Sequence, residues 1–242
     1  MMFKDIVQIN EANRAVYLNA LFLLFLLLVG VADAFAIVIA YFFETIVIGL
    51  IHVVKLYLTV RYGRPSSPQS KGMDGYGIIP FFMVHYGLFV GVQSIFVITF
   101  FAPSMFEDVS PSNIVENYGD TLLTSGMLVV LASIIFTNLA YFYTNFLNPK
   151  RYEAYAPDEI FMKPYLRIFI QQFVVILAGF FFIILDAGMA AALFLVLIRT
   201  FVDLVIVGIR KDSTLVGVLA HKLARSHEEV PKIEKTLQQL SE

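Results

Sequence analysis

The sequence predicts an all-α fold, a polytopic membrane bundle of six transmembrane helices in three hairpins. Three observations lead to this class. Of 242 residues, 59% are hydrophobic and only 15% are charged, whereas soluble chains are near half apolar and a quarter charged. The hydrophobic residues form five long tracts, one of them long enough for two spans. Positive charge is concentrated in every second loop.

The number of helices follows from the lengths of the tracts. About 20 residues cross the hydrocarbon layer, so the first tract holds two helices and divides between Gly30 and Asp33. The apolar run after Arg14 is longer than that of a usual signal peptide and another span follows directly, so we expect the first helix to be retained. The expected spans are 15–31, 34–60, 76–101, 121–146, 164–184 and 188–210.

The loop charges predict the orientation of the bundle. Of the 17 Lys and Arg residues, all except Lys55 and Arg199 lie in or beside the N-terminal segment 1–14, the loops 61–75 and 147–167, or the tail 211–242. The three remaining loops carry only acidic charges. Because positively charged loops stay on the cytoplasmic side, we expect both termini to be cytoplasmic and residues 15–210 to form one multi-pass domain of the inner (cytoplasmic) membrane.

Composition and the tail indicate the partners. The chain has no Cys, which excludes disulfides and Cys-based zinc sites. The lipid bilayer is the expected partner, and no nucleic acid is expected. Apolar residues of the tail recur at helical spacing, which is typical of an amphipathic helix on the cytoplasmic leaflet. Docking of a partner membrane subunit is the alternative. The residues of this pattern are Leu215, Val218, Leu219 and Leu223, beside Lys222 and Arg225.

Polar side chains recur inside the predicted spans. Each ionisable group costs about 3 kcal/mol to insert, so such groups normally face the interior and pair. Lys55 lies only about 20° around the helix from Glu44, and Arg199 and Asp203 have the i,i+4 spacing of an ion pair. The expected members of an intramembrane polar cluster are Glu44, His52, Lys55, His85, Gln93, Asn138, Arg167, Gln171, Arg199 and Asp203.

Depth along the helices predicts that most of these groups meet. At about 1.5 Å per residue, Glu44 lies about 24 Å from the cytoplasmic end of its helix. Arg167 is counted with the cytoplasmic loop. We therefore expect a polar cavity open toward the cytoplasmic side, unless each group merely hydrogen-bonds a neighbouring helix. The residues expected at depths of about 10 to 16 Å are His52, His85, Asn138, Gln171, Arg199 and Asp203.

Three functional hypotheses follow. The cavity would bind or translocate a proton or a small polar ligand. Alternatively, the chain is an intramembrane metal-dependent enzyme, or a structural subunit or assembly factor of a larger membrane complex. Serine protease chemistry is disfavoured, because Leu123 stands where the nucleophile motif needs Gly. No cofactor is identified. The metal-ligand candidates are Glu44, His52, His85 and Asp203.

Four motifs stand out in the predicted spans: Tyr41-Phe-Phe-Glu44 with Lys55, Phe81-Phe82-x-x-His85-Tyr86-Gly87, Pro164-Tyr165-x-Arg167 and Arg199-Thr200-x-x-Asp203. In these motifs the chain resembles the uncharacterised six-helix membrane proteins of bacteria and archaea that form a domain of unknown function. The resemblance covers most of residues 15–210 and implies a prokaryotic six-helix membrane protein without a known activity. Where relatives show further His, this chain has Gln93, Asn138 and Gln171 or Gln172, so a haem or multi-His metal site is not expected.

Overall fold

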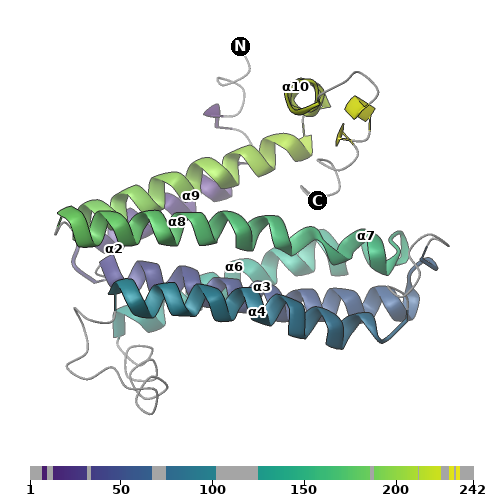
Figure 1. Ribbon diagram of the computed structural model, residues 1–242, viewed down its shortest axis with the longest axis horizontal. Helices are drawn as coiled ribbons and strands as arrows, with labels where there is room; N and C mark the ends of the chain where they lie inside the picture. The colour runs from purple at the N-terminus through teal and green to yellow at the C-terminus, as the bar shows by residue number, and fades with distance from the viewer. Residues whose placement is uncertain are drawn as a thin grey trace.

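In the residues that the computed structural model describes, every element of regular secondary structure is a helix (Figure 1). The described residues are 7–9, 13–31, 34–66, 75–101, 125–185, 188–211, 213–224, 229–231 and 233–234. The α-helices are α2 (Arg14–Leu28), α3 (Ala34–Tyr62), α4 (Ile78–Phe101), α6 (Ser125–Phe142), α7 (Pro157–Phe161), α8 (Lys163–Leu185), α9 (Gly188–Lys211) and α10 (Ser213–Leu223). A π-helical turn, η2 (Tyr143–Leu147), and a 3-10 turn, η3 (Arg151–Glu153), follow α6.

Four segments of the described chain are long and apolar enough to cross a membrane, which is consistent with a membrane protein. Their lengths run from 21 to 27 residues, or about 30 to 40 Å of helix. The predicted all-α class is therefore confirmed at this coarser level. The segments are Ala36–Tyr62, Ile78–Thr99, Gly126–Leu147 and Pro157–Leu177.

The predicted division of the first apolar tract is confirmed at the end of α2. The backbone of Gly30 adopts a φ of +69°, a left-handed conformation that glycine accepts without a steric cost. The Gly30 N–H donates to the carbonyl of Leu27, and the Val31 N–H donates to the carbonyl of Leu26. These two hydrogen bonds form a Schellman cap, which ends the helix. The 15 residues of α2 extend about 22 Å, less than the hydrocarbon thickness.

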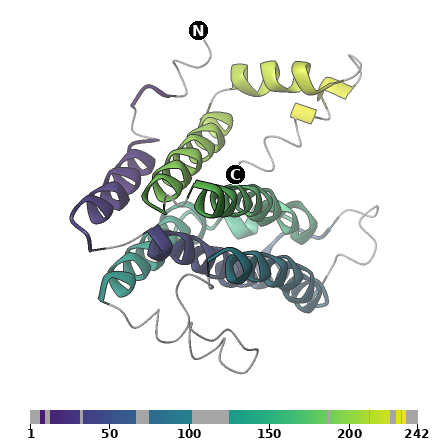
Figure 2. The ribbon, with the colours of Figure 1, turned by 60° about the vertical axis from the view of Figure 1, so that its left-hand side comes forward.

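Helix α3 is the centre of the bundle. It lies between α4 and α6 and also contacts α8 and α9 (Figures 1 and 2). The consecutive helices α8 and α9 pack side by side, whereas α2 packs on α9. Neighbours in the chain are therefore not always neighbours in space. Because α3 touches helices on several sides, polar groups that it carries are removed from lipid.

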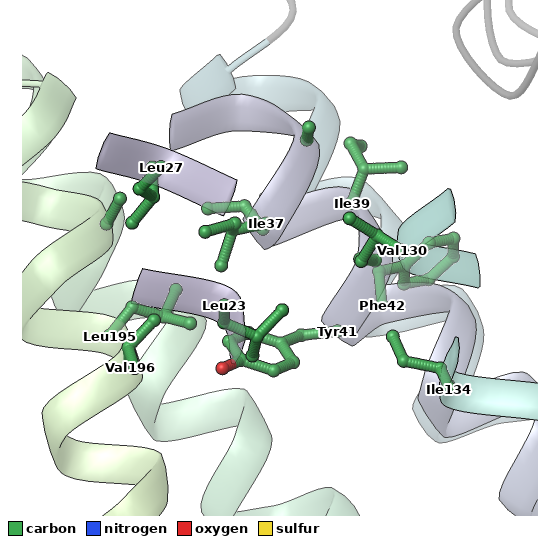
Figure 3. Close-up of a cluster of buried hydrophobic side chains, with 14 of the residues drawn as sticks. Leu23, Leu27, Ile37, Ile39, Tyr41, Phe42, Val130, Ile134, Leu195 and Val196 are labelled. Atoms are coloured by element: carbon green, nitrogen blue, oxygen red, sulfur yellow. The ribbon is translucent and has the colours of Figure 1, made fainter. Parts of the chain in front are cut away.

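The main hydrophobic core lies around the first half of α3. Figure 3 shows Leu23 of α2, Ile37 of α3 and Leu195 of α9 close together on one side of α3. On another side, Phe42 lies near Val130 of α6. All five of these side chains are buried, so this core holds α2, α3, α6 and α9 together.

Large apolar side chains cover the outer surfaces of α4 and α6. Only 22% of the α4 span and 17% of the α6 span are buried, against 56% of the α3 span. Exposed examples are Val84 on α4 and Phe136 on α6. Contiguous exposed apolar surface of this kind marks contact with lipid or with other proteins. The lengths of the spans favour contact with lipid.

The segment 147–167, expected to be a loop, is largely helical. Pro157 begins α7, where its missing N–H costs nothing, and Glu159 accepts a hydrogen bond from the N–H of Ala156 at 2.8 Å. Glu159 also pairs with Arg64 at 3.0 Å, and Arg64 donates to the carbonyl of Ala154 at 2.7 Å. The two loops expected to be cytoplasmic are therefore joined.

The apolar pattern predicted for the tail is described only in part, because the side chains of Leu215, Leu219 and Leu223 lie outside the described set. Val216 and Ala220 of α10 are buried, whereas Val218 is 37% exposed. A carboxylate oxygen of Glu234 lies 3.3 Å from where a Cβ of Gly217 would stand. The tail thus folds back onto α10, a contact that spacing within one helix does not reveal. Arg225 lies outside the described residues.

Candidate functional site

Two carboxylates and two guanidinium groups form a closed ring between α3, α8 and α9. Glu44 Oε1 contacts Arg167 Nη2 at 3.0 Å, and Glu44 Oε2 contacts Arg199 Nη2. Asp203 Oδ2 lies 3.4 Å from Arg199 Nε, and Asp203 Oδ1 lies 3.9 Å from Arg167 Nη2. Each charge therefore contacts both opposite charges. We call these four residues the charge ring.

The charge ring is neutral and unevenly buried. The Glu44 side chain is 4% exposed and that of Arg199 10%, whereas Asp203 is 22% and Arg167 34% exposed. Buried charges are tolerated when they are paired and hydrogen-bonded. Glu44 and Arg199 form the inner side of the ring. Arg167 and Asp203 form the outer side, where the contact is longest.

Neighbouring side chains complete the coordination of the ring. Asn138 of α6 donates to Glu44 Oε1 at 3.2 Å and to the carbonyl of Ile134 at 2.9 Å. The guanidinium carbon of Arg199 lies 4.0 Å from the centroid of the Tyr41 ring, a cation–π contact. Thus α6 also contributes to this site. The predicted i,i+4 ion pair of Arg199 with Asp203 is present.

A pocket of about 20 Å³ lies beside the ring. This volume is sufficient for one water-sized molecule. The surface that lines the pocket is almost entirely apolar, and Arg199 Nη1 is buried without a hydrogen-bond partner among the described residues. The lining residues are Tyr41, Arg167, Ile170, Gln171, Val174, Val175, Leu195, Arg199, Val202 and Asp203.

A second set of hydrogen bonds joins α3, α4 and α8 next to the ring. The Thr45 hydroxyl donates to Gln171 Oε1 at 2.8 Å, and Gln171 Nε2 donates to the carbonyl of Tyr41 at 3.3 Å. The Tyr86 hydroxyl donates to the carbonyl of Thr45 at 2.9 Å. A Cβ on Gly49 would stand 2.5 Å from the Tyr86 ring, so glycine lets this ring approach α3.

The histidines lie away from the ring. His85 Nδ1 is 2.8 Å from the Tyr165 hydroxyl. The His52 ring packs 4.9 Å from that of Phe82, and its Nε2 has no hydrogen-bond partner within the described part of the chain. Both therefore belong to the aromatic cluster that α3, α4, α7 and α8 form, which also includes Phe161.

Lys55 and Gln93 are also separate from the ring. The Lys55 ammonium lies 5.2 Å from the centroid of the Phe146 ring in η2. Gln93 is fully buried, and neither amide atom has a hydrogen-bond partner among the residues that the structure covers. Of the ten candidates from the sequence, the structure gathers Glu44, Asn138, Arg167, Gln171, Arg199 and Asp203.

One family model matches the chain, over residues 2–232, and it describes a family of unknown function, DUF6498. The match covers nearly the whole chain. The chain belongs to this family. The resemblance stated from the motifs is thereby confirmed for membership in a family of unknown function. No curated protein and no solved structure matches the chain.

For this member of DUF6498, the depth expected for Glu44 is wrong, because Glu44 was expected to lie deeper than Arg199 and Asp203. Arg167 was counted with the cytoplasmic loop in the charge tally but was also a predicted member of the polar cluster, and it contacts Glu44. The contacts described above bring all four together. Counting residues from assumed helix ends ignores the offsets between helices. It also ignores the length of arginine side chains, which carry a charge far from the backbone.

Sequence reasoning missed Thr45 and Tyr165 in this DUF6498 chain. Thr45 carried no signal, because threonine commonly hydrogen-bonds its own helix, as Thr45 does to the carbonyl of Tyr41 at 3.2 Å. Tyr165 lies near the predicted cytoplasmic end of its span, a position at which the sequence alone favours an interfacial anchor. Among the described residues, no three His, Asp or Glu side chains are grouped to hold a metal ion. His52 and His85 lie in the aromatic cluster, apart from Glu44 and Asp203.

Proposed function

We propose that this chain is a multi-pass protein of the cytoplasmic membrane whose charge ring binds or transfers a proton or a small polar ligand. The observation that carries the proposal is the closed ring beside a water-sized pocket. The alternative, that the ring only holds helices together, needs fewer charges. One ion pair would join α3 to α9, whereas the chain places four ionisable groups there, each costly to insert.

The uneven burial of the ring supports ligand access from its outer side. Arg167 and Asp203 are the more exposed members, and their 3.9 Å contact is the longest of the four. Both line the pocket with Arg199 and Gln171. The surface that lines the pocket is almost entirely apolar, so a ligand that entered here would reach the charged groups only at the edge of the ring. The small volume restricts it to a proton carried by water or to a ligand of similar size.

The ring also supports the six-span topology. Helix α9 carries Arg199 and Asp203 within 24 residues, a length of about 36 Å. Pairing within the ring lowers the cost of placing these charges in lipid. If α9 and the shorter α2 are counted with the four apolar segments as spans, the positive loops lie on one side and both termini are cytoplasmic. We propose in addition that the pocket opens toward the cytoplasmic side.

Reporter fusions test the topology. We expect a fluorescent protein fused after Glu242 to be fluorescent in bacterial cells and alkaline phosphatase at the same site to be inactive, because the tail stays in the cytoplasm. Phosphatase fused after Ser112, in an acidic loop, should be active. An active phosphatase after Glu242 would contradict the orientation.

A flux assay tests the role of the ring. Purified protein is reconstituted into liposomes that contain a pH-sensitive dye, and a potassium gradient with valinomycin imposes a potential. We expect proton uptake above that of protein-free liposomes, and we expect Glu44→Gln to reduce it to that background, because the amide cannot exchange a proton. The matched control, Glu153→Gln, changes an exposed carboxylate and should leave the uptake unchanged.

Two results would contradict parts of this proposal. Equal proton uptake by the wild type and by Glu44→Gln would show that the ring does not carry the proton. Uptake by the wild type no faster than by protein-free liposomes would remove translocation and leave ligand binding alone. Circular dichroism of the Glu44→Gln protein shows whether the variant keeps its helices, so that loss of uptake is not loss of fold.

A further inference from the structure

A second site lies on the aromatic face that α4 and α8 share, separate from the charge ring. We propose that His85 and Tyr165, with Phe81 and Phe89, bind the planar head of a lipid-soluble ligand of the quinone or phenol class. Such a head carries a carbonyl or hydroxyl group on a flat ring. The residues, their contacts and their depth in the span each point to this chemistry.

The polar part of the site is a fixed dyad. His85 Nδ1 lies 2.8 Å from the Tyr165 hydroxyl, so this hydrogen bond sets the orientation of the imidazole. The other ring nitrogen, Nε2, has no hydrogen-bond partner among the described residues. His85 is half-buried. One hydrogen-bonding position on a preoriented ring is therefore available to a ligand.

The apolar part of the site consists of flat rings around the imidazole. The Phe81 ring is nearly parallel to His85, at 7° and 5.6 Å between centroids. The Phe89 ring stands at 86° and 5.5 Å. These residues lie one turn before and one turn after His85 on the same side of α4. Phe81 is 51% and Phe89 39% exposed, so both offer ring surface for stacking or edge contact with a planar head.

The position of the dyad argues for a ligand that dissolves in the membrane. Histidine within a span normally faces the interior of the bundle, yet α4 is mostly unburied. His85 lies seven residues after the start of α4 at Ile78, or about 10 Å along the helix. At that depth the imidazole is below the phospholipid head groups, if α4 begins at the membrane surface. A planar carbonyl or hydroxyl compound reaches it, whereas a charged head group does not.

Thermal unfolding of the purified full chain in detergent tests this site with decylubiquinone as the probe. We expect the quinone to raise the unfolding temperature with increasing concentration. Methyl decanoate, which has a carbonyl group but no ring, should not do so. The rise should disappear in His85→Phe and become smaller in Tyr165→Phe. The matched control is Phe136→Leu, which alters an exposed ring on α6 and should respond as the wild type does.

Three results would overturn the proposal. They are an equal rise in the wild type and in His85→Phe, an equal rise with methyl decanoate, and no rise with the quinone in the wild type. If His85→Phe does not fold, the double variant Phe81→Leu/Phe89→Leu replaces it, and loss of the quinone effect is again expected. Both probes are measured against the same folded protein, so the result does not depend on whether the charge ring transfers protons.

Discussion

Replacing Arg199 with methionine is expected to lower the free energy of unfolding by about 3 to 5 kcal/mol, the usual cost of removing one partner of a buried ion pair. The variant leaves Glu44, whose side chain is 4% exposed, with Arg167 as its remaining guanidinium partner. The charge ring then has a net charge of about −1 in a site of low dielectric. Unfolding in mixed detergent, followed by circular dichroism, measures the change.

The double variant Glu44→Gln/Arg199→Met tests whether the net charge of the ring causes the loss of stability in Arg199→Met. It leaves Arg167 and Asp203, which neutralise one another, so we expect it to lose less stability than the sum of the two single variants. A coupling energy of about 0.5 to 3 kcal/mol is typical of residues in one network. Additive losses would show that Glu44 and Arg199 do not act as a pair.

The exposed pair of Arg64 and Glu159 supplies the control for this experiment. Their side chains are 59% and 33% exposed, so solvent screens the attraction. Exposed pairs contribute about 0.2 to 1 kcal/mol. Arg64→Met should therefore cost much less than Arg199→Met. A similar loss in both variants would contradict the assignment of low dielectric to the charge ring.

Replacing Gly63 with alanine is expected to destabilise the protein by about 1 to 3 kcal/mol, as overpacking does. The added Cβ would stand 2.5 Å from the carbonyl oxygens of Thr59 and Tyr155 and 2.7 Å from that of Tyr152. These oxygens belong to the backbone, so they cannot rotate away as a side chain would. Relief of the contacts with Tyr152 and Tyr155 requires that the end of α3 separate from the segment around η3, and relief of the contact with Thr59 requires that the last turn of α3 change. Thermal unfolding in detergent measures the loss.

Gly77 provides the matched control for Gly63. No atom lies within 4 Å of a Cβ added at Gly77 among the described residues, so Gly77→Ala should change the free energy of unfolding by no more than about 0.5 kcal/mol. Equal effects of the two substitutions would show that the close packing at Gly63 is not maintained in the folded protein.

Much of the helical framework can be predicted from the sequence, because it depends on local chemistry. Apolar tracts of membrane length become helices, since the backbone must satisfy its own hydrogen bonds in lipid. Gly30 ends α2 because its left-handed φ of +69° suits glycine. The spacing of Arg199 and Asp203 predicts their contact for the same reason, since four residues are about one turn of helix.

The charge ring, by contrast, depends on how helices are placed against one another. Residue spacing places a group at an angle and a height on its own helix, but the rotation and offset between α3, α8 and α9 come from packing of the whole core. Those offsets bring Arg167 and Glu44 to 3.0 Å, a contact that the sequence did not specify although it predicted both residues for one polar cluster. The same packing places Tyr165 beside His85. Which polar groups share a site is thus decided by tertiary contacts, because side chains such as His85 and Tyr165, or Glu44 and Arg167, meet although the chain separates them by 80 and 123 residues.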